Sequence, residues 1–154
     1  MYEFNMLSTN KLEHCNSVAK VMYYLAKNCL KADEDTCNEM ATLGMVHDIG
    51  YMFNYDSTKH PISGSKSIPG YKYAAEIEYH GKVDKADYSL PLKLLNFADL
   101  HVDYRGNIVS TEKRLTDIMY RYGAGSRQFQ NASSLAKIIH NDVWEKELKY
   151  IKEI

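Results

Sequence analysis

Apolar residues recur at helical spacing along most of this chain, and no strand-like alternation of any length interrupts them. Val18, Met22 and Leu25, for example, return every three or four positions, which places them on one face of a helix. The pattern predicts an all-α fold, a compact bundle of about five to seven helices. With 154 residues, 45% of them hydrophobic and 25% charged, the chain is long enough to form one domain with a substantial core, over residues 1–154.

Residues that start and stop helices divide the chain into predicted segments. The first helix begins at Thr9 or Asn10 and runs to about Leu30. The second begins at the acidic run 33–35, where the helix dipole favours negative charge, and ends at Gly50. Further helices are predicted from Pro61, over 71–79, after a loop that ends at Leu90-Pro91 and through Asp99, from Ser110 or Thr111 to Arg121, and over about 127–152.

Three side chains that can bind a metal fall on these apolar faces. His14 lies one turn before Val18, and His47 follows Leu43 by four residues, so both histidines are predicted to point into the core. Asp99 shares its helical stripe with leucines. A buried carboxylate costs several kcal/mol unless it is paired or bound to a metal. The placement of Asp99 therefore indicates a binding site.

Six residues of this kind stand in a fixed order along the chain. They are His14, His47, Asp48, His60, His80 and Asp99. Mixed imidazole and carboxylate ligands suit iron, manganese, cobalt, nickel or zinc better than magnesium, so the site is predicted to bind one or two divalent transition metal ions. His60 and His80 have an alternative interpretation, as a helix-entry residue and as a C-terminal cap.

The ordered set resembles the HD superfamily of metal-dependent phosphohydrolases, over roughly residues 9–105. The resemblance implies a single HD domain, a compact helical bundle in which the C-terminal helices of about 110–154 pack on the metal-binding core. Members with both middle histidines commonly hold two metals. By the same resemblance, His47 and Asp48 are the expected catalytic residues, and Asp48 both binds metal and orients the attacking water.

One position departs from the pattern of that superfamily. Many HD proteins have a lysine shortly after the His-Asp pair, where this chain has Tyr51. Lys59, Lys66 and Arg105 are the predicted substitutes for that lysine as contacts to a substrate phosphate. The alternative for each of these three side chains is a solvated position on the surface.

The resemblance implies metal-dependent hydrolysis of a phosphate ester or anhydride. The expected substrate is a small nucleotide, such as a dinucleoside polyphosphate or a nucleoside monophosphate, because small bacterial members with this ligand set include hydrolases of diadenosine tetraphosphate. Two other functions use the same residue types: oxidation by a dinuclear-iron HD oxygenase, and nucleotide sensing without turnover. We expect a phosphohydrolase, because a pure sensor has no need of open metal positions.

Charge and composition argue against several partners. The net charge of −1 at pH 7 gives no electrostatic reason to expect a nucleic acid or an anionic membrane as the partner. The first residues lack the basic and apolar runs of a signal peptide, and no apolar stretch is long enough to span a bilayer. Cys15, Cys29 and Cys37 form no closely spaced pair, which favours a reduced, cytoplasmic setting. Nothing in the pattern indicates a particular oligomeric state.

Several titratable or cationic residues fall outside the ordered set. His101 comes two positions after the last predicted ligand and is expected on the opposite, exposed side of that helix. Arg114 and Arg121 share one helical face and are predicted to be solvated, paired with a neighbouring acid such as Asp117. His140 is predicted to take part in ordinary packing of the last helix.

Overall fold

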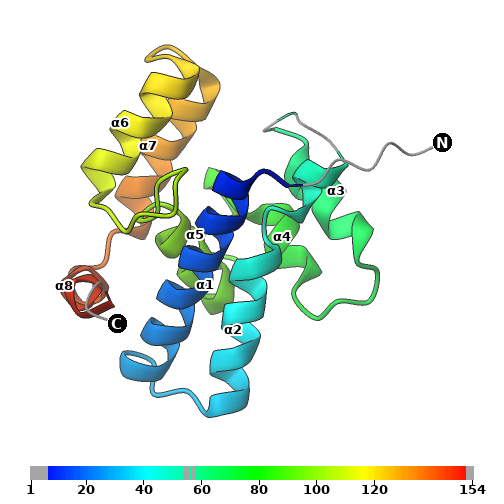
Figure 1. Cartoon of the computed structure of the whole chain (residues 1–154), viewed down its shortest axis with the longest axis vertical. Coiled ribbons are helices and arrows are strands. Elements are labelled where there is room, and N and C mark those ends of the chain that lie inside the picture. The colour runs from blue at the N-terminus through cyan, green and yellow to red at the C-terminus, as the bar shows by residue number, and fades with distance from the viewer. Residues whose placement is uncertain (1–6, 54–55, 57, 152–154) are drawn as a thin grey trace.

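Helices dominate the chain, as Figure 1 shows. The computed structural model describes residues 7–53, 56 and 58–151. These residues form eight α-helices: α1 (Thr9–Asn28), α2 (Glu34–Val46), α3 (His60–Ser67), α4 (Ala74–Tyr79), α5 (Leu90–Asp99), α6 (Thr111–Tyr122), α7 (Arg127–Ile139) and α8 (Asp142–Ile151), with two 3-10 helices, η1 (Ile49–Met52) and η2 (Val83–Lys85). Within the described ranges there is no strand, and an isolated bridge joins Val102 to Ile108. The prediction of an all-α fold is confirmed.

The bundle has one α-helix more than the five to seven predicted, because the segment 127–152 forms two helices rather than one. His140 adopts an extended backbone, with φ −51° and ψ 133°, and this ends α7. The side chain of Asn141 then accepts a hydrogen bond from the backbone N–H of Trp144 at 3.0 Å, which starts α8. Helical periodicity continues across both helices, so the apolar pattern alone does not reveal the break.

The helix caps follow local side-chain chemistry. Asp33 caps α2 by accepting from the N–H of Thr36 at 2.8 Å, and Ser110 caps α6, both within the predicted choices. The cap of α1 is Ser8 rather than Thr9 or Asn10. The second helix ends at Val46, before the predicted stop at residue 50, and the chain continues as η1.

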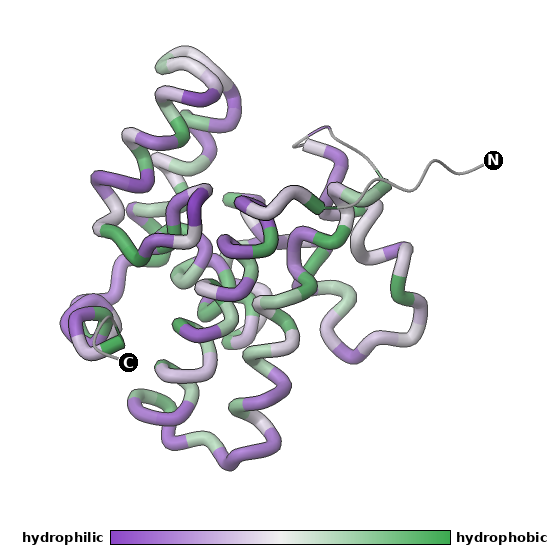
Figure 2. The backbone as a smooth tube through the Cα atoms, in the orientation of Figure 1, coloured by the Kyte–Doolittle hydropathy of each residue, from purple (hydrophilic) through white to green (hydrophobic). Residues whose placement is uncertain are grey.

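The main core lies between α1, α2 and α5, which are side by side in Figure 1. Val18, Leu25 and Leu43 are completely buried there, and burying each of these side chains stabilises the fold by roughly 1.5–3 kcal/mol. Figure 2 shows hydrophobic and hydrophilic positions alternating in short runs along these helices, as helices with one buried face require. A Cβ on Gly44 would lie 2.8 Å from the Cα of Ala19, so the glycine lets α1 and α2 touch backbone to backbone.

Helices α6 and α7 form a hairpin with a smaller apolar cluster of its own, which includes Leu100, Ile118 and Leu135. The hairpin packs on the rest of the molecule through contacts of α7 with α5 and η2. It rises beside the start of α1 in Figure 1. Among the helices of the described residues, none combines the length and the apolar character needed to cross a membrane.

Candidate metal centre

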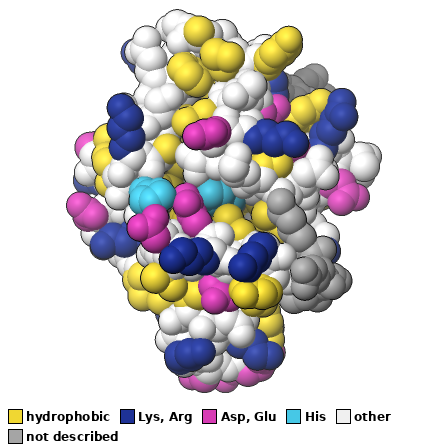
Figure 3. All heavy atoms as spheres, turned by 90° about the vertical axis from the view of Figure 1, so that its left-hand side faces the viewer, with side chains coloured by type: hydrophobic (Ala, Val, Ile, Leu, Met, Phe, Trp, Pro, Cys, Tyr) yellow, Lys and Arg dark blue, Asp and Glu magenta, His cyan; other side chains and the backbone are white. Residues whose placement is uncertain are grey.

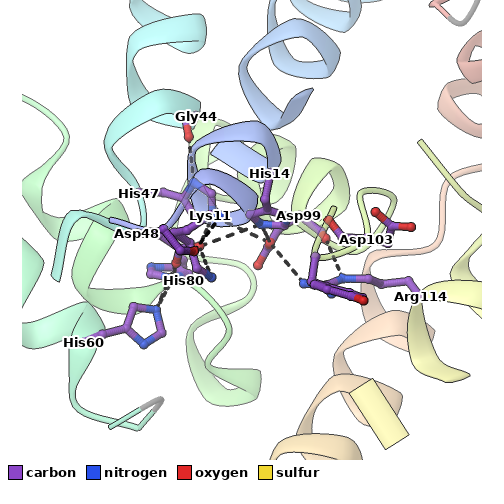
Figure 4. A network of polar contacts seen from close by, with 12 residues as sticks. Lys11, His14, Gly44, His47, Asp48, His60, His80, Asp99, Asp103 and Arg114 are labelled. Carbon is purple, nitrogen blue, oxygen red and sulfur yellow. Dashed lines mark hydrogen bonds and ion pairs between the residues drawn. The ribbon is translucent and has the colours of Figure 1, made fainter. Parts of the chain in front are cut away.

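All six side chains of the ordered set converge on one point inside the bundle (Figure 4). They come from five places in the fold: α1, the end of α2, the start of α3, the end of α4 and the end of α5. Five of the six are buried, namely His14, His47, Asp48, His60 and His80, and Asp99 is half-buried. Residues spread over 86 positions of the chain therefore meet in a single cluster.

Asp48 lies between two groups of histidines. Its Oδ2 is 3.3 Å from Nε2 of His47 and 3.7 Å from Nε2 of His14. Its Oδ1 is 3.1 Å from Nε2 of His60 and 3.5 Å from Nε2 of His80. One carboxylate thus presents a different oxygen to each histidine pair, the arrangement that a bridging ligand between two metal ions requires.

Asp99 completes the first of these groups. Its Oδ1 lies 2.8 Å from Nε2 of His14 and 3.6 Å from Nε2 of His47. The first group therefore consists of two imidazoles and two carboxylates, and the second of two imidazoles and the shared Asp48. A six-coordinate ion in either group would keep positions free for water or substrate, because each group offers at most four protein ligands.

The backbone fixes which nitrogen of three histidines faces the centre. Nδ1 of His14 donates to the carbonyl of Asp103 at 2.9 Å, Nδ1 of His47 to Gly44 at 2.6 Å, and Nδ1 of His80 to Ile77 at 2.5 Å. A neutral imidazole whose Nδ1 carries the proton has a lone pair on Nε2. Carbonyl partners of this kind are the usual support behind metal-ligating histidines. The three Nε2 atoms that point inward are therefore prepared to bind a cation.

The distances within the cluster fit a metal ion. Ligand atoms held about 2.1 Å from one transition metal lie roughly 3.0–3.4 Å from each other. The oxygen-to-nitrogen distances here run from 2.8 to 3.7 Å, and Nε2 of His60 lies 3.0 Å from Nε2 of His80. Nε2 of His47 is buried and has no hydrogen-bond partner among the described residues. Lone pairs facing each other at these distances repel unless a cation lies between them.

The pKa shifts of residues in the cluster also indicate that its centre favours a positive charge. Burial alone would raise the pKa of Asp48, but His47 and Lys11 hold it well below its ordinary value. The same holds for Asp99, where burial opposes and His14 and His47 lower the pKa. Burial would lower the pKa of His47, yet the facing carboxylates of Asp48 and Asp99 raise it well above 6.5. The carboxylates thus favour a positive charge at the centre of the cluster.

A close backbone contact positions His60. A Cβ on Gly50 would come within 1.8 Å of the carbonyl oxygen of His60 and within 2.8 Å of the N–H nitrogen of Gly64, so η1 and α3 touch at this point. Tyr51 stacks on the ring of His60, with 4.0 Å between centroids and 14° between planes. Burial lowers the pKa of His60 below its ordinary value, although Asp48 opposes the shift. His60 is thus held as a neutral ring facing the centre.

A cavity of about 610 Å³ opens beside the cluster. Its wall includes Asp48, His60, His80 and Asp99 together with residues of α6 and α7. Its volume is within the range of roughly 300–1,000 Å³ that is typical of sites for small molecules. The cluster is therefore accessible to a ligand of that size.

The cationic residues predicted to contact phosphate lie elsewhere. Lys59, Lys66 and Arg105 are exposed and do not line the cavity. Lys11 does line it: its Nζ lies 3.1 Å from Oδ2 of Asp48 and 4.3 Å from the centroid of the Tyr51 ring. Sequence reasoning missed Lys11, although a residue three positions before a ligand on a helix shares its face.

Two predictions about neighbouring residues were wrong. Arg114 is 8% exposed rather than solvated, because it bonds to the carbonyl of Asp99 at 3.2 Å as well as to the predicted acid, Asp117, at 2.9 Å. His101 is 3% exposed rather than on the surface. Helix α5 ends before it, and the chain folds back so that Nδ1 of His101 donates to the carbonyl of Val109 at 2.9 Å.

A second, smaller group of metal-binding residue types lies on the surface. His140, Asp142 and Glu145 come within reach of one another at the start of α8. Nε2 of His140 is 2.7 Å from Asp142, and its Nδ1 is 3.2 Å from Glu145. Figure 3 shows a face of the molecule on which histidine and acidic side chains lie next to one another. Both ring nitrogens of His140 face carboxylates, so neither is held by a backbone carbonyl.

Comparisons of this chain with known protein families, with curated proteins and with solved structures found no match. The geometry of the buried cluster is therefore the basis for functional inference. That geometry supports a centre for one or two metal ions, with Asp48 between the two positions.

Proposed function

We propose that this protein is a metal-dependent phosphohydrolase of the HD type, which cleaves a phosphate ester or anhydride. The observation that carries the proposal is the position of Asp48, whose two oxygens face two separate histidine pairs in a buried cluster. The order of the ligands along the chain, which resembles the HD superfamily, supports it. The accessible cavity beside the cluster supports an enzyme rather than a structural metal site.

Each residue of the ligand set has its own role in the proposed reaction. A divalent transition metal bound here would supply a Lewis acid and lower the pKa of a coordinated water toward about 7. His14, His47 and Asp99 would hold the first ion, and His60 and His80 the second. Asp48 would bridge them and orient the water that attacks phosphorus. No protein nucleophile is needed for this reaction.

Lys11 supplies a cation where the HD pattern commonly has a lysine and this chain has Tyr51. Its ammonium group stands over the Tyr51 ring and contacts Asp48, so a lysine on α1 occupies the space beside the ligands. Side-chain relative exposure is 22% for Lys11, which leaves its ammonium open toward the cavity. A phosphate oxygen in the cavity would meet this charge, and the negative charge that develops on phosphate in the transition state would be stabilised.

The volume of the cavity and the position of Tyr122 favour a small nucleotide as the substrate. Tyr122 lines the cavity and can offer its ring to a base, whereas both faces of the Tyr51 ring are already covered, one by His60 and the other by Lys11. Dinucleoside polyphosphates and nucleoside monophosphates are the two substrate groups we propose to examine first.

Metal analysis of protein purified without chelator tests the proposal directly. We expect one to two equivalents of transition metal per chain, and turnover of p-nitrophenyl phosphate or of a nucleotide with added manganese, cobalt, nickel or iron. Activity that survives complete exclusion of oxygen separates hydrolysis from an oxygenase reaction. A protein that binds no transition metal, or binds it without hydrolysing any phosphate compound of the panel, contradicts the proposed function.

A further inference from the structure

The wall of the cavity beside the metal centre carries more cationic than acidic side chains. Lys11, Lys82, Arg114, Arg121 and Arg127 line the cavity, whereas Asp84 is the single acid that lines it apart from the ligands Asp48 and Asp99, among the residues that the structure describes. Two bound divalent ions would add further positive charge. One phosphate monoester carries at most two negative charges, so it would leave most of this positive charge uncompensated.

Three of these cations, Lys82, Arg121 and Arg127, form no ion pair with a carboxylate among the described residues. Arg114 already pairs with Asp117 and approaches Asp99, so its charge is largely compensated within the protein. Arg121 and Arg127, in contrast, form no ion pair with a carboxylate in residues 7–53, 56 and 58–151. An arginine that lines a cavity without an acidic partner is available to an anionic ligand.

Arg121 is also held in place. Its guanidinium carbon lies 5.2 Å from the centroid of the Tyr104 ring and 5.3 Å from that of Tyr122. Contacts of this kind orient a guanidinium plane while leaving its N–H groups to bind oxygen atoms. Arg127 begins α7, across the four-residue connection that follows Tyr122. Both arginines thus belong to the tip of the α6–α7 hairpin, and both line the same cavity as His60 and His80.

We propose that Arg121 and Arg127 bind a second anionic group of the substrate, while the metal centre binds the phosphate that is cleaved. This inference rests on the proposed function and narrows it. The substrate class becomes small phosphate compounds that carry a further phosphate or other anionic group beyond the scissile bond. The planar arginine fork matches a phosphate oxygen pair, so a second phosphate is the preferred partner of the hairpin.

Binding of two inorganic probes to the metal-loaded protein tests the inference. Wild-type protein is expected to bind tripolyphosphate more tightly than orthophosphate, as measured by calorimetry. In the double variant R121M/R127M, we expect the ratio of the two dissociation constants to fall by at least about tenfold, the effect of losing one charge-assisted hydrogen bond. Methionine keeps an unbranched apolar stem and removes the charged fork.

The matched control removes two charges from the same helices at exposed positions outside the cavity. K113M/K137M changes the net charge equally, and we expect it to preserve the preference for tripolyphosphate. Equal behaviour of the two double variants, or a wild-type protein without the preference, would overturn the inference. Absence of turnover on every phosphate compound in wild-type protein contradicts the hydrolase itself, whereas a wild-type protein that turns over a phosphate compound but does not prefer tripolyphosphate contradicts only the second anion site. Circular dichroism and Tm establish that each variant is folded.

Discussion

Two clusters in this molecule bring histidines and carboxylates together, and they differ in what stands behind the rings. In the buried centre, Nδ1 of His14, His47 and His80 donates to backbone carbonyls, so each Nε2 faces inward as an acceptor. In the surface cluster, both nitrogens of His140 face carboxylates, and the side chain is 54% exposed. The hydrogen bond from His140 to Asp142 and the charge of Glu145 raise the pKa of His140 above its ordinary value.

Residues that can bind a metal do not make a metal centre merely by lying close together, as the contrast between the two clusters indicates. The surface cluster lies within six consecutive residues, and exposed ion pairs of that kind contribute little to stability. The buried centre draws its ligands from helices far apart in the chain and places their charges in the interior, where an unpaired charge is costly. A bound cation offsets that cost. The charges of the surface cluster are exposed to solvent, so no cation is required to stabilise them.

Replacing Asp48 has the largest expected effect. In Asp48→Asn the bridging charge is lost, so we expect at least one metal ion to be lost and turnover to fall by roughly a thousandfold or more, because a water without its metal keeps a pKa near 16. Metal content and hydrolysis of p-nitrophenyl phosphate are the measurements. Asp142→Asn is the matched change in the surface cluster, and metal content and turnover are expected to stay at wild-type values. If Asp48→Asn kept full activity, the proposed mechanism would be wrong.

Replacing His80 tests whether the two histidine groups of the buried centre bind metal separately. His80 contacts the Oδ1 side of Asp48 and no atom of Asp99, so His80→Ala is expected to lose one metal equivalent while the other is retained. Elemental analysis after desalting measures the stoichiometry. The comparison variant is His140→Ala, which we expect to leave the stoichiometry unchanged. Unaltered metal content in His80→Ala would assign His80 to a structural or substrate-binding role.

Arg114 acts on the centre through Asp99. It donates to the Asp99 carbonyl and lies 3.7 Å from its Oδ1, so Arg114→Met is expected to loosen this ligand. Loss of such a supporting contact typically weakens metal affinity about 10–100-fold. Competition with a chelator of known affinity measures the change. Lys113→Met, at the exposed neighbouring position, is expected to keep the wild-type affinity; an Arg114→Met protein that does the same would show that Asp99 is positioned by its helix alone.

The pH dependence of the buried centre gives the smallest effect. The pKa of His47 is raised in the metal-free protein, so its contribution to stability is complete below 6.5 and is lost as the pH rises through the raised value. Metal competes with that proton, and its affinity changes in the opposite direction. The Tm difference between metal-loaded and chelator-treated protein is therefore expected to grow as the pH rises above 6.5. A difference that is constant from pH 6 to 9 would exclude proton competition at His47.

Local chemistry made much of this structure predictable. Apolar spacing placed His14, His47 and Asp99 on inward faces, and the buried positions of His14 and His47 agree with that reasoning. Caps such as Asp33 and Ser110 could be read from side chains that bond to nearby N–H groups. In each of these cases the information lies within one turn of helix.

The direction that the chain takes after a helix ends could not be predicted in this way, and neither could the contacts that follow from it. His101 is buried because the chain turns back beyond α5, and a helical wheel does not extend past the end of its helix. Arg114 reaches Asp99 only because α6 crosses the end of α5, a contact that no sequence period encodes. The cavity wall that carries Arg121 and Arg127 depends on where the α6–α7 hairpin packs, which is a property of the tertiary fold.

The contact of Gly50 with the start of α3 has a consequence for how such chains can vary. Any larger residue at position 50 would have to push the backbone of His60 away, although His60 itself would remain in the sequence. A protein altered only at this glycine would keep every candidate ligand by name while the backbone of His60 is displaced from its place beside Asp48. The candidate ligands in a sequence therefore do not define the geometry of a site unless the small residue beside them is considered too.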